Sequence, residues 1–195
     1  MKMRIGKGDA LIVVDVQNDF VTGTLPVPGA EEAIQKMVEW IGKFHNLGLS
    51  THYTIDWHPP DHSSFKSYGG TWPVHCVQNT WGAEFHERII TALSIFLTRF
   101  TSITKGETVE IDEYSGFRNP SLNERLVMLD VNRVFIVGLA TDYCVKATAM
   151  DAVDFGYEVI VVSEAIAGAN LEDGDVEKAI EEMTQAGVTM LLGDE

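Results

Sequence analysis

The sequence is poor in positive charge and has no long apolar run. It carries 14 lysine and arginine residues against 29 aspartate and glutamate residues, for a net charge of −15. Such a surface repels nucleic-acid phosphates, so we expect no nucleic-acid partner. No segment approaches the roughly 20 apolar residues that span a bilayer, and the first residues lack the apolar core of a signal peptide. We therefore predict a cytoplasmic protein with no membrane partner.

Cysteine is scarce as well, since only Cys76 and Cys144 are present. Their spacing excludes a C-x-x-C motif, and a cytosolic domain of this size does not need a disulfide, so we expect two free thiols. The chain also lacks the G-x-G-x-x-G motif that follows the first strand of dinucleotide-binding domains. This absence argues against an oxidoreductase of that type and leaves the thiols as candidates for chemistry.

Strand-like and helix-like segments alternate along the chain without internal repeats, which predicts a single domain over residues 1–195. The expected strands are 10–16, 50–55, 101–104, 133–138, 157–162 and 188–192. The expected helices are 31–46, 84–93, 121–129, 141–155 and 175–186. Such alternation predicts an α/β fold with three layers (α/β/α) and a six-stranded parallel sheet in the order 3-2-1-4-5-6.

Four residues with reactive side chains lie at the ends of expected strands. Asp15, Asp56 and Lys105 close the first three strands, and Cys144 lies just past the fourth. The carboxyl ends of parallel strands form one rim, where open α/β sheets bind ligands. A thiol in the first turn of a helix beside a lysine has a lowered pKa, and Asp15 can accept its proton. Each residue alone has an ordinary structural explanation, but together they predict an activated nucleophile with an acid/base partner.

Asp56, His58 and His75 form a second group of candidate functional residues. A carboxylate and an imidazole two residues apart can point into one loop cavity, and His75 follows 17 residues after His58. One aspartate and two histidines suit zinc, iron or manganese, with open positions for water or substrate. Spacing alone is weak evidence, because loops collect histidines. We interpret the other histidines as surface or structural residues: His45, His52, His62 and His86.

Two longer segments resemble the signatures of the isochorismatase-like cysteine hydrolases. Residues 15–20, DVQNDF, are similar to the family's D-x-Q-x-D-F, and residues 138–145, GLATDYCV, are similar to its nucleophile segment G-x-x-T-D-x-C-V. Lys105 with the following glycine matches the family's lysine. The resemblance covers essentially the whole chain in the right order, from about residue 9 to residue 192. It implies the isochorismatase-like version of the fold predicted above.

The resemblance also implies a mechanism. In it Asp15 deprotonates Cys144, whose thiolate attacks a carboxamide to form a thioester, while Lys105 stabilises the charges. The backbone amides of Ala140 and Cys144 hold the oxyanion. The family further implies a cis peptide bond between Leu139 and Ala140.

Within the family, Asp56, His58 and His75 match the metal site of nicotinamidases, and residues 71–76 are similar to the segment around its second histidine. The resemblance thus implies hydrolysis of nicotinamide to nicotinate and ammonia, a step in NAD salvage. One divalent metal ion, most simply zinc with iron and manganese as alternatives, would anchor the pyridine nitrogen. Some members have a further histidine ligand where this chain has Ser64, so Ser64 or water would complete the shell.

Phe20 and Trp72 match the family positions that sandwich the substrate ring. Two alternatives stay open. One is a hydrolase of the same family that acts on pyrazinamide-like or carbamoyl compounds. The other is a binding protein that kept the fold and lost catalysis, against which the complete set of Asp15, Lys105 and Cys144 argues. A homo-oligomer is also left open by the sequence.

Overall fold

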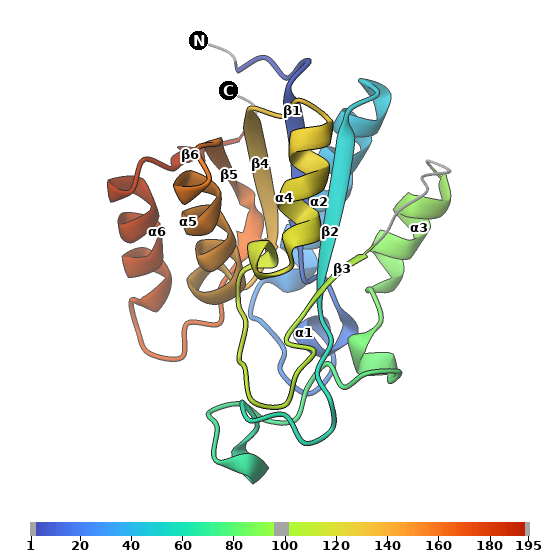
Figure 1. The fold of residues 1–195 in the computed structure, drawn as a ribbon, viewed down its shortest axis with the longest axis vertical. Coiled ribbons are helices and arrows are strands. Elements are labelled where there is room, and N and C mark those ends of the chain that lie inside the picture. Colours follow the sequence, from blue (N-terminus) through green and yellow to red (C-terminus); the bar gives the residue numbers. More distant parts are fainter. Residues whose placement is uncertain (1–2, 96–101, 194–195) are drawn as a thin grey trace.

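The computed structural model describes residues 3–95 and 102–193. Its centre is a six-stranded parallel sheet in the order β3-β2-β1-β4-β5-β6, which confirms the predicted order (Figure 1). The first residue of the expected third strand, Thr101, lies outside the described residues. The strands are β1 (Asp9–Val14), β2 (Ser50–Asp56), β3 (Ser102–Lys105), β4 (Arg133–Leu139), β5 (Glu158–Ala167) and β6 (Thr189–Leu191).

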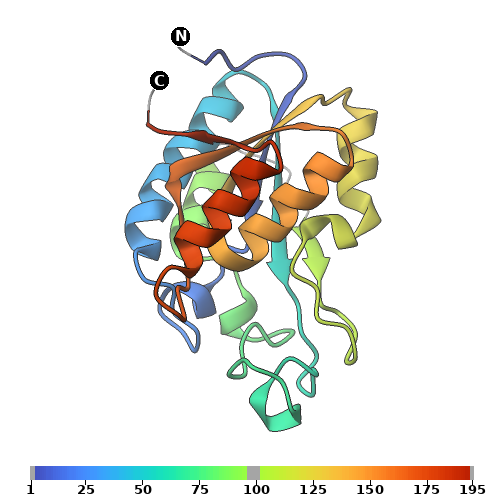
Figure 2. The same cartoon turned by 90° about the vertical axis from the view of Figure 1, so that its left-hand side faces the viewer.

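Helices cover both faces of the sheet and complete the three predicted layers. The α-helices are α1 (Asn18–Val21), α2 (Ala30–Asn46), α3 (Glu87–Ile95), α4 (Pro120–Met128), α5 (Lys146–Asp154) and α6 (Asp175–Gln185). One face packs against α2 and α3 and the other against α4, α5 and α6 (Figures 1 and 2). Among the described residues, no helix is both long and apolar enough to cross a membrane.

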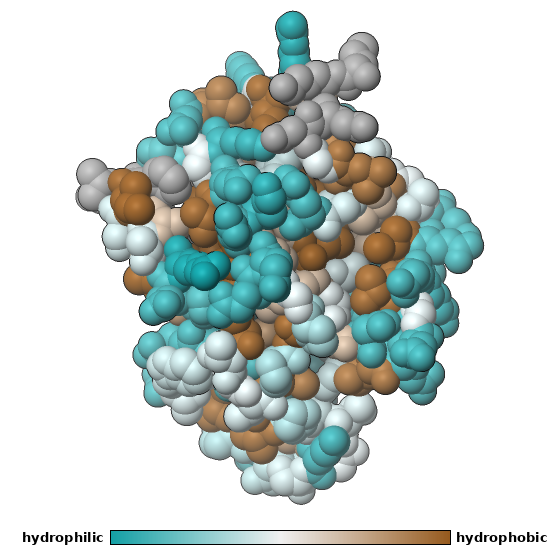
Figure 3. Space-filling view, turned by 180° about the vertical axis from the view of Figure 1, so that it is seen from behind, coloured by the Kyte–Doolittle hydropathy of each residue, from teal (hydrophilic) through white to brown (hydrophobic). Residues whose placement is uncertain are grey.

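The central strand β1 is buried on both faces, as its continuous apolar sequence predicts. Leu11 and Val13 pack toward α2, whereas Ile12 packs toward α4 and α5. Fully burying a side chain of this size contributes roughly 1.5–3 kcal/mol. The outer side of α2 is polar, and in Figure 3 apolar areas are interrupted by hydrophilic side chains on this side of the molecule. The apolar face of α2 and the two apolar faces of β1 thus determine that helices pack on both sides of the sheet.

Most elements lie within three residues of the predicted bounds, and three segments differ in a way that has a structural cause. The strand β1 ends at Val14, because Asp15 takes a left-handed conformation with φ 50°. The helix expected over 141–155 begins as a π-helical turn, η4 (Thr141–Val145), before α5 starts. The strand β5 continues to Ala167. The pairing register shifts between Ile136 and Gly138 of β4, so that the last two residues of β4 pair with Ile166 and Ala167 at the end of β5.

Several short helices were also missed, because one turn is too short to show a helical period. They are α1, η1 (Lys66–Tyr68), η2 (Trp81–Ala83) and η3 (Gly116–Arg118). The first three lie in the loops after β1 and β2, which gather below the sheet in Figure 1. These loops, with those after β3 and β5, enclose the candidate site at the carboxyl ends of the strands.

Candidate active site

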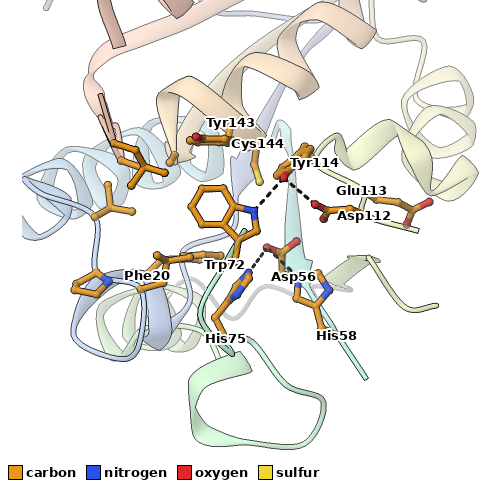
Figure 4. Close-up of a pocket in the computed structure, with 16 residues that line it drawn as sticks. Phe20, Asp56, His58, Trp72, His75, Asp112, Glu113, Tyr114, Tyr143 and Cys144 are labelled. Atoms are coloured by element: carbon orange, nitrogen blue, oxygen red, sulfur yellow. Dashed lines mark hydrogen bonds and ion pairs between the residues drawn. The ribbon is translucent and has the colours of Figure 1, made fainter. Parts of the chain in front are cut away.

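A pocket of about 590 Å³ opens at the carboxyl ends of the central strands (Figure 4). Apolar and aromatic walls enclose a few polar groups. The lining residues are Phe20, Leu25, Pro26, Val27, Asp56, His58, Trp72, His75, Asp112, Glu113, Tyr114, Ala140, Tyr143, Cys144, Ala169 and Leu171.

Lys105 lies at the centre of a buried charged cluster beneath this pocket. Its Nζ lies 2.9 Å from Asp15 Oδ2 and donates to Cys144 Sγ at 3.3 Å. The same Nζ donates to Asp56 Oδ1. Thr54 holds the other oxygen of Asp15, since Thr54 Oγ1 donates to Asp15 Oδ1 at 2.6 Å. The structure thus brings together all four residues expected at the rim.

The pKa of Cys144 differs from the sequence prediction. We expected a lowered pKa, but burial raises the pKa of this thiol well above its usual value, and the charges of Asp15 and Asp56 raise it further. Lys105 acts in the predicted direction and lowers this pKa, but does not outweigh the other groups. The thiol is therefore protonated at neutral pH in the free protein and needs a base to become a nucleophile.

The charges around Lys105 prepare Asp15 for that task. Burial raises the pKa of Asp15, and Asp56 adds to the rise, although Lys105 and Thr54 lower it. Burial lowers the pKa of Lys105, but the two carboxylates outweigh this effect and hold its pKa well above the usual value. A carboxylate with a raised pKa beside a permanent cation is suited to accept and return a proton.

The peptide bond between Leu139 and Ala140 is cis, as the family resemblance implied. It leads from β4 into η4, the turn that carries Cys144. The carbonyl of Ala140 accepts from the amides of Tyr143 and Val145, which ties the start of this turn to its end. Gly138, with φ 131°, lies against the backbone of Val14, where a Cβ atom would come within 2.2 Å of its carbonyl oxygen.

Asp56, His58 and His75 form the second polar group of the pocket, and their ligand atoms lie within 4.8 Å of one another. In each imidazole Nδ1 forms a hydrogen bond with a backbone carbonyl oxygen. The distance is 3.0 Å from His58 to Gly106 and 2.8 Å from His75 to Pro73. Carbonyls only accept, so Nδ1 carries a proton in each ring, and Nε2 is the nitrogen that faces Asp56. The two Nε2 atoms face Asp56 Oδ2 at 3.6 and 3.9 Å.

These distances fit a shared metal ion. Two ligands held ~2.1 Å from a tetrahedral zinc ion lie about 3.4 Å apart. Burial raises the pKa of Asp56, but Lys105, His58 and His75 outweigh this and hold it well below the usual value, so the carboxylate is ionised. Gly106, with φ 65°, allows the close approach of His58, because a Cβ atom there would come within 2.4 Å of the imidazole Cε1.

Ser64, which the resemblance offers beside water to complete the metal shell, is buried. Its hydroxyl instead pairs with Nδ1 of His62 at 2.7 Å. The ring of His62 is buried and stacks on His58, with 4.2 Å between ring centroids. His52 and His86 are buried as well, and burial of these three histidines is compatible with their interpretation as surface or structural residues.

Phe20 and Trp72 both line the pocket, and each ring contacts His75. Sequence reasoning missed the two tyrosines beside them. Trp72 Nε1 donates to Tyr114 Oη at 3.0 Å, and its ring packs edge-on against Tyr143 with centroids 4.8 Å apart. Tyr143 precedes the nucleophile within the quoted motif, which was a usable signal, whereas Tyr114 lies in a loop that offers none.

Both cysteines are free, as predicted, and both are buried. The raised pKa of Cys76 has burial as its main cause, with Asp56, Asp19 and Asp15 adding to it. Cys144 alone of the two lines the pocket. A buried thiol between a carboxylate and a lysine, beside an imidazole–carboxylate set, is an arrangement typical of the active sites of enzymes that use covalent catalysis.

The sequence matches the Isochorismatase domain family over residues 9–195. It is 33% identical to the nicotinamidase of Escherichia coli (strain K12), with 93% of each chain covered. The pyrazinamidase of Pyrococcus horikoshii in complex with zinc shares 42% identity and a TM-score of 0.83, over 94% of this chain and 98% of its own. PnC1 from L. infantum in complex with nicotinate shares 32% identity and a TM-score of 0.86, over 98% and 96%. The chain belongs to the isochorismatase family.

Proposed function

We propose that this protein hydrolyses nicotinamide to nicotinate and ammonia through a thioester on Cys144. The observation that carries the proposal is the presence in one pocket of a nucleophile cluster and of two imidazoles that turn free Nε2 atoms toward a carboxylate. Relatives that share the family and most of their length with this chain are nicotinamidases, which supports the same substrate.

The covalent step needs only side chains of this chain. Asp15 accepts the Sγ proton of Cys144, and the thiolate adds to the carboxamide carbon. Lys105, 2.9 Å from Asp15 and 3.3 Å from the sulfur, stabilises the negative charge as it moves from carboxylate to thiolate. The raised pKa of Asp15 reduces the cost of taking a proton from a thiol whose own pKa is raised.

The backbone amides of Ala140 and Cys144 would stabilise the oxyanion that forms next. Loss of one such donor typically costs about 2.7–4 kcal/mol of transition-state stabilisation. Asp15 then returns its proton to the departing nitrogen, and ammonia leaves a nicotinoyl thioester on the sulfur. Water, deprotonated by Asp15, adds to the thioester carbon. Collapse of that adduct releases nicotinic acid, which ionises to nicotinate, and Asp15 returns its proton to the departing thiolate.

Asp56, His58 and His75 would hold one divalent metal ion, since their free lone pairs and spacing fit such an ion. Zinc is the ion we propose, with iron and manganese as alternatives that bind the same donor types. The ion would supply a Lewis-acidic anchor for the pyridine nitrogen, which orients the substrate rather than generating the nucleophile. Phe20 and Trp72 would enclose the ring from the apolar walls.

Ammonia release by the purified, metal-loaded protein tests this function. A panel of nicotinamide, pyrazinamide and small carbamoyl compounds, with metal analysis of the same sample, separates the candidates. We expect turnover of nicotinamide and of pyrazinamide, whose ring also offers a nitrogen. Turnover of carbamoyl compounds alone would favour the other family activity, and a metal-loaded protein that releases no ammonia from any amide would favour a binding protein.

A further inference from the structure

We propose that Gln17 and Asp19 are positioning residues that hold Asp56 and His75 at metal-binding distance. This inference rests on the metal site of the proposed function. Both residues belong to the segment DVQNDF, whose first residue, Asp15, is the base of the covalent step. Neither side chain lines the pocket, so any effect on the substrate is indirect.

Gln17 holds the backbone of Asp56 from both sides. Its side-chain Oε1 accepts from the Asp56 amide at 2.8 Å, and its Nε2 donates to the Asp56 carbonyl at 2.8 Å. Nε2 also donates to the carbonyl of Ala83 at 3.0 Å. The side chain is fully buried. Because three directed bonds fix one amide group, the end of β2 has little freedom to rotate the Asp56 carboxylate away from the histidines.

Asp19 does the same for the segment that carries His75. Its Oδ2 accepts from the amide of Cys76, the next residue, at 2.7 Å, and its Oδ1 accepts from Thr24 at 3.0 Å. Cys76 has φ 46°, a left-handed conformation that a non-glycine residue keeps only when its surroundings impose it. Gly82 makes room for this carboxylate, since a Cβ atom there would lie 2.0 Å from Oδ2.

The spacing of the segment explains how one turn reaches both sites. Every second side chain of the segment contacts a different part of the site. Asp15 contacts Lys105, Gln17 contacts the end of β2, and Asp19 contacts the loop that carries His75. Groups that orient metal ligands without touching the ion typically change metal affinity about 10- to 100-fold when they are removed. The structure therefore assigns the D-x-Q-x-D pattern a second role, which is to set the geometry of the metal ligands.

The test measures the zinc dissociation constant of purified variants by competition with a chromophoric chelator. Asp19→Asn cannot accept from both the Cys76 and the Thr24 amide, and we expect about 10- to 100-fold weaker zinc binding. Asp142→Asn is the matched control. The Asp142 carboxylate is equally buried and also accepts from two backbone amides, those of Ala169 and Asn170, but it touches no ligand segment. We expect its zinc affinity to equal that of the wild type.

A second pair of variants tests the other positioning residue. Gln17→Met removes the three bonds with a side chain of similar length, and we expect a similar loss of zinc affinity. Asn18→Leu is its control, because the neighbouring amide donates to the carbonyl of Trp81 instead. The melting temperature of each metal-free protein and the rate at which iodoacetamide labels Cys144 report on the fold and on the covalent cluster. Both should change no more in each variant than in its control.

The outcomes separate the inference from the proposed function. If the wild type binds no zinc, iron or manganese, the metal part of the proposed function fails. If the wild type binds metal and Asp19→Asn and Gln17→Met bind it as tightly, the positioning role is overturned. It is also overturned if both variants lose their fold without metal while both controls keep it, because the two residues would then serve folding rather than the ligands.

Discussion

Asp15, Lys105 and Cys144 form a cluster around one buried ammonium group, whereas Asp56, His58 and His75 turn possible metal-ligand atoms toward a common point. In the first group a buried ammonium lies 2.9 Å from a carboxylate oxygen and 3.3 Å from the sulfur. In the second group the two Nε2 atoms lie 3.6 and 3.9 Å from Asp56 Oδ2, and each Nδ1–H donates to a backbone carbonyl.

This difference separates what side chains can do alone from what needs an added ion. In the proposed function, proton transfer and nucleophilic attack require only the first group. The second group would hold a cation and, through it, the pyridine ring of the substrate. Asp56 belongs to both, since it contacts Lys105 through Oδ1 and faces the histidines through Oδ2. Four variants and one chelation experiment test this division of the pocket.

The largest effect should follow loss of the nucleophile. We expect Cys144→Ala to lower the turnover number for nicotinamide by about 10⁴-fold or more, as removal of a nucleophile does in other covalent hydrolases. Zinc affinity should stay at the wild-type value, because the sulfur contacts Lys105 rather than the ligand histidines. Cys76→Ala, the other buried thiol, is the control and should keep most of the activity. Undiminished turnover in Cys144→Ala would refute the assignment.

Loss of a metal ligand should have the next largest effect. We expect His75→Ala to purify without stoichiometric metal and to lose about 100-fold in kcat/KM, since a misplaced substrate typically costs that much. Iodoacetamide should still label Cys144, because the covalent cluster does not include His75. Metal analysis and labelling on one sample check this. Equal loss of labelling and of metal would show that the two groups cannot be separated.

Thr54→Val should change the pH dependence rather than the maximum rate. The free Asp15 carboxylate is the active form, so kcat/KM should fall as the pH decreases through its raised pKa. Thr54 lowers that pKa through its hydrogen bond, against the raising effects of burial and Asp56. Its loss should move the acid limb to higher pH by about one pH unit. The control is Thr51→Val on the same strand, and an unmoved acid limb in Thr54→Val would contradict the role of Asp15.

The smallest effect should come from the pocket wall. Trp72→Phe keeps an aromatic ring but loses the hydrogen bond to Tyr114 Oη, so we expect KM to rise about 2- to 10-fold with kcat nearly unchanged. Tyr114→Phe removes the same bond from the other side and should give a similar rise. Steady-state kinetics of both variants checks this. A fall in kcat without a change in KM would mean that Trp72 acts on the reacting groups.

The sequence predicted the sheet order and the convergence of Asp15, Asp56, Lys105 and Cys144, because strand periodicity and the rim of a parallel sheet are local and general features. It did not predict the raised pKa of Cys144, since the extent of burial depends on packing from distant segments. The hydrogen bonds of Gln17 to the backbone of Asp56 could not be predicted either, because the two residues lie 39 positions apart, although the motif that contains Gln17 resembles a family signature. Tyr114 was missed because irregular loops carry no periodic signal.

Comparison of nicotinamide with benzamide tests the division of the pocket most directly, because the two amides differ only in the ring nitrogen. We expect the metal-loaded protein to favour nicotinamide by about 100-fold or more in kcat/KM, and we expect this preference to fall to near unity after the metal is removed by chelation. Benzamide turnover itself should survive chelation, since it needs only Asp15, Lys105 and Cys144. A preference for nicotinamide that is unchanged in the metal-free protein would contradict the assignment of Asp56, His58 and His75 to the ring nitrogen.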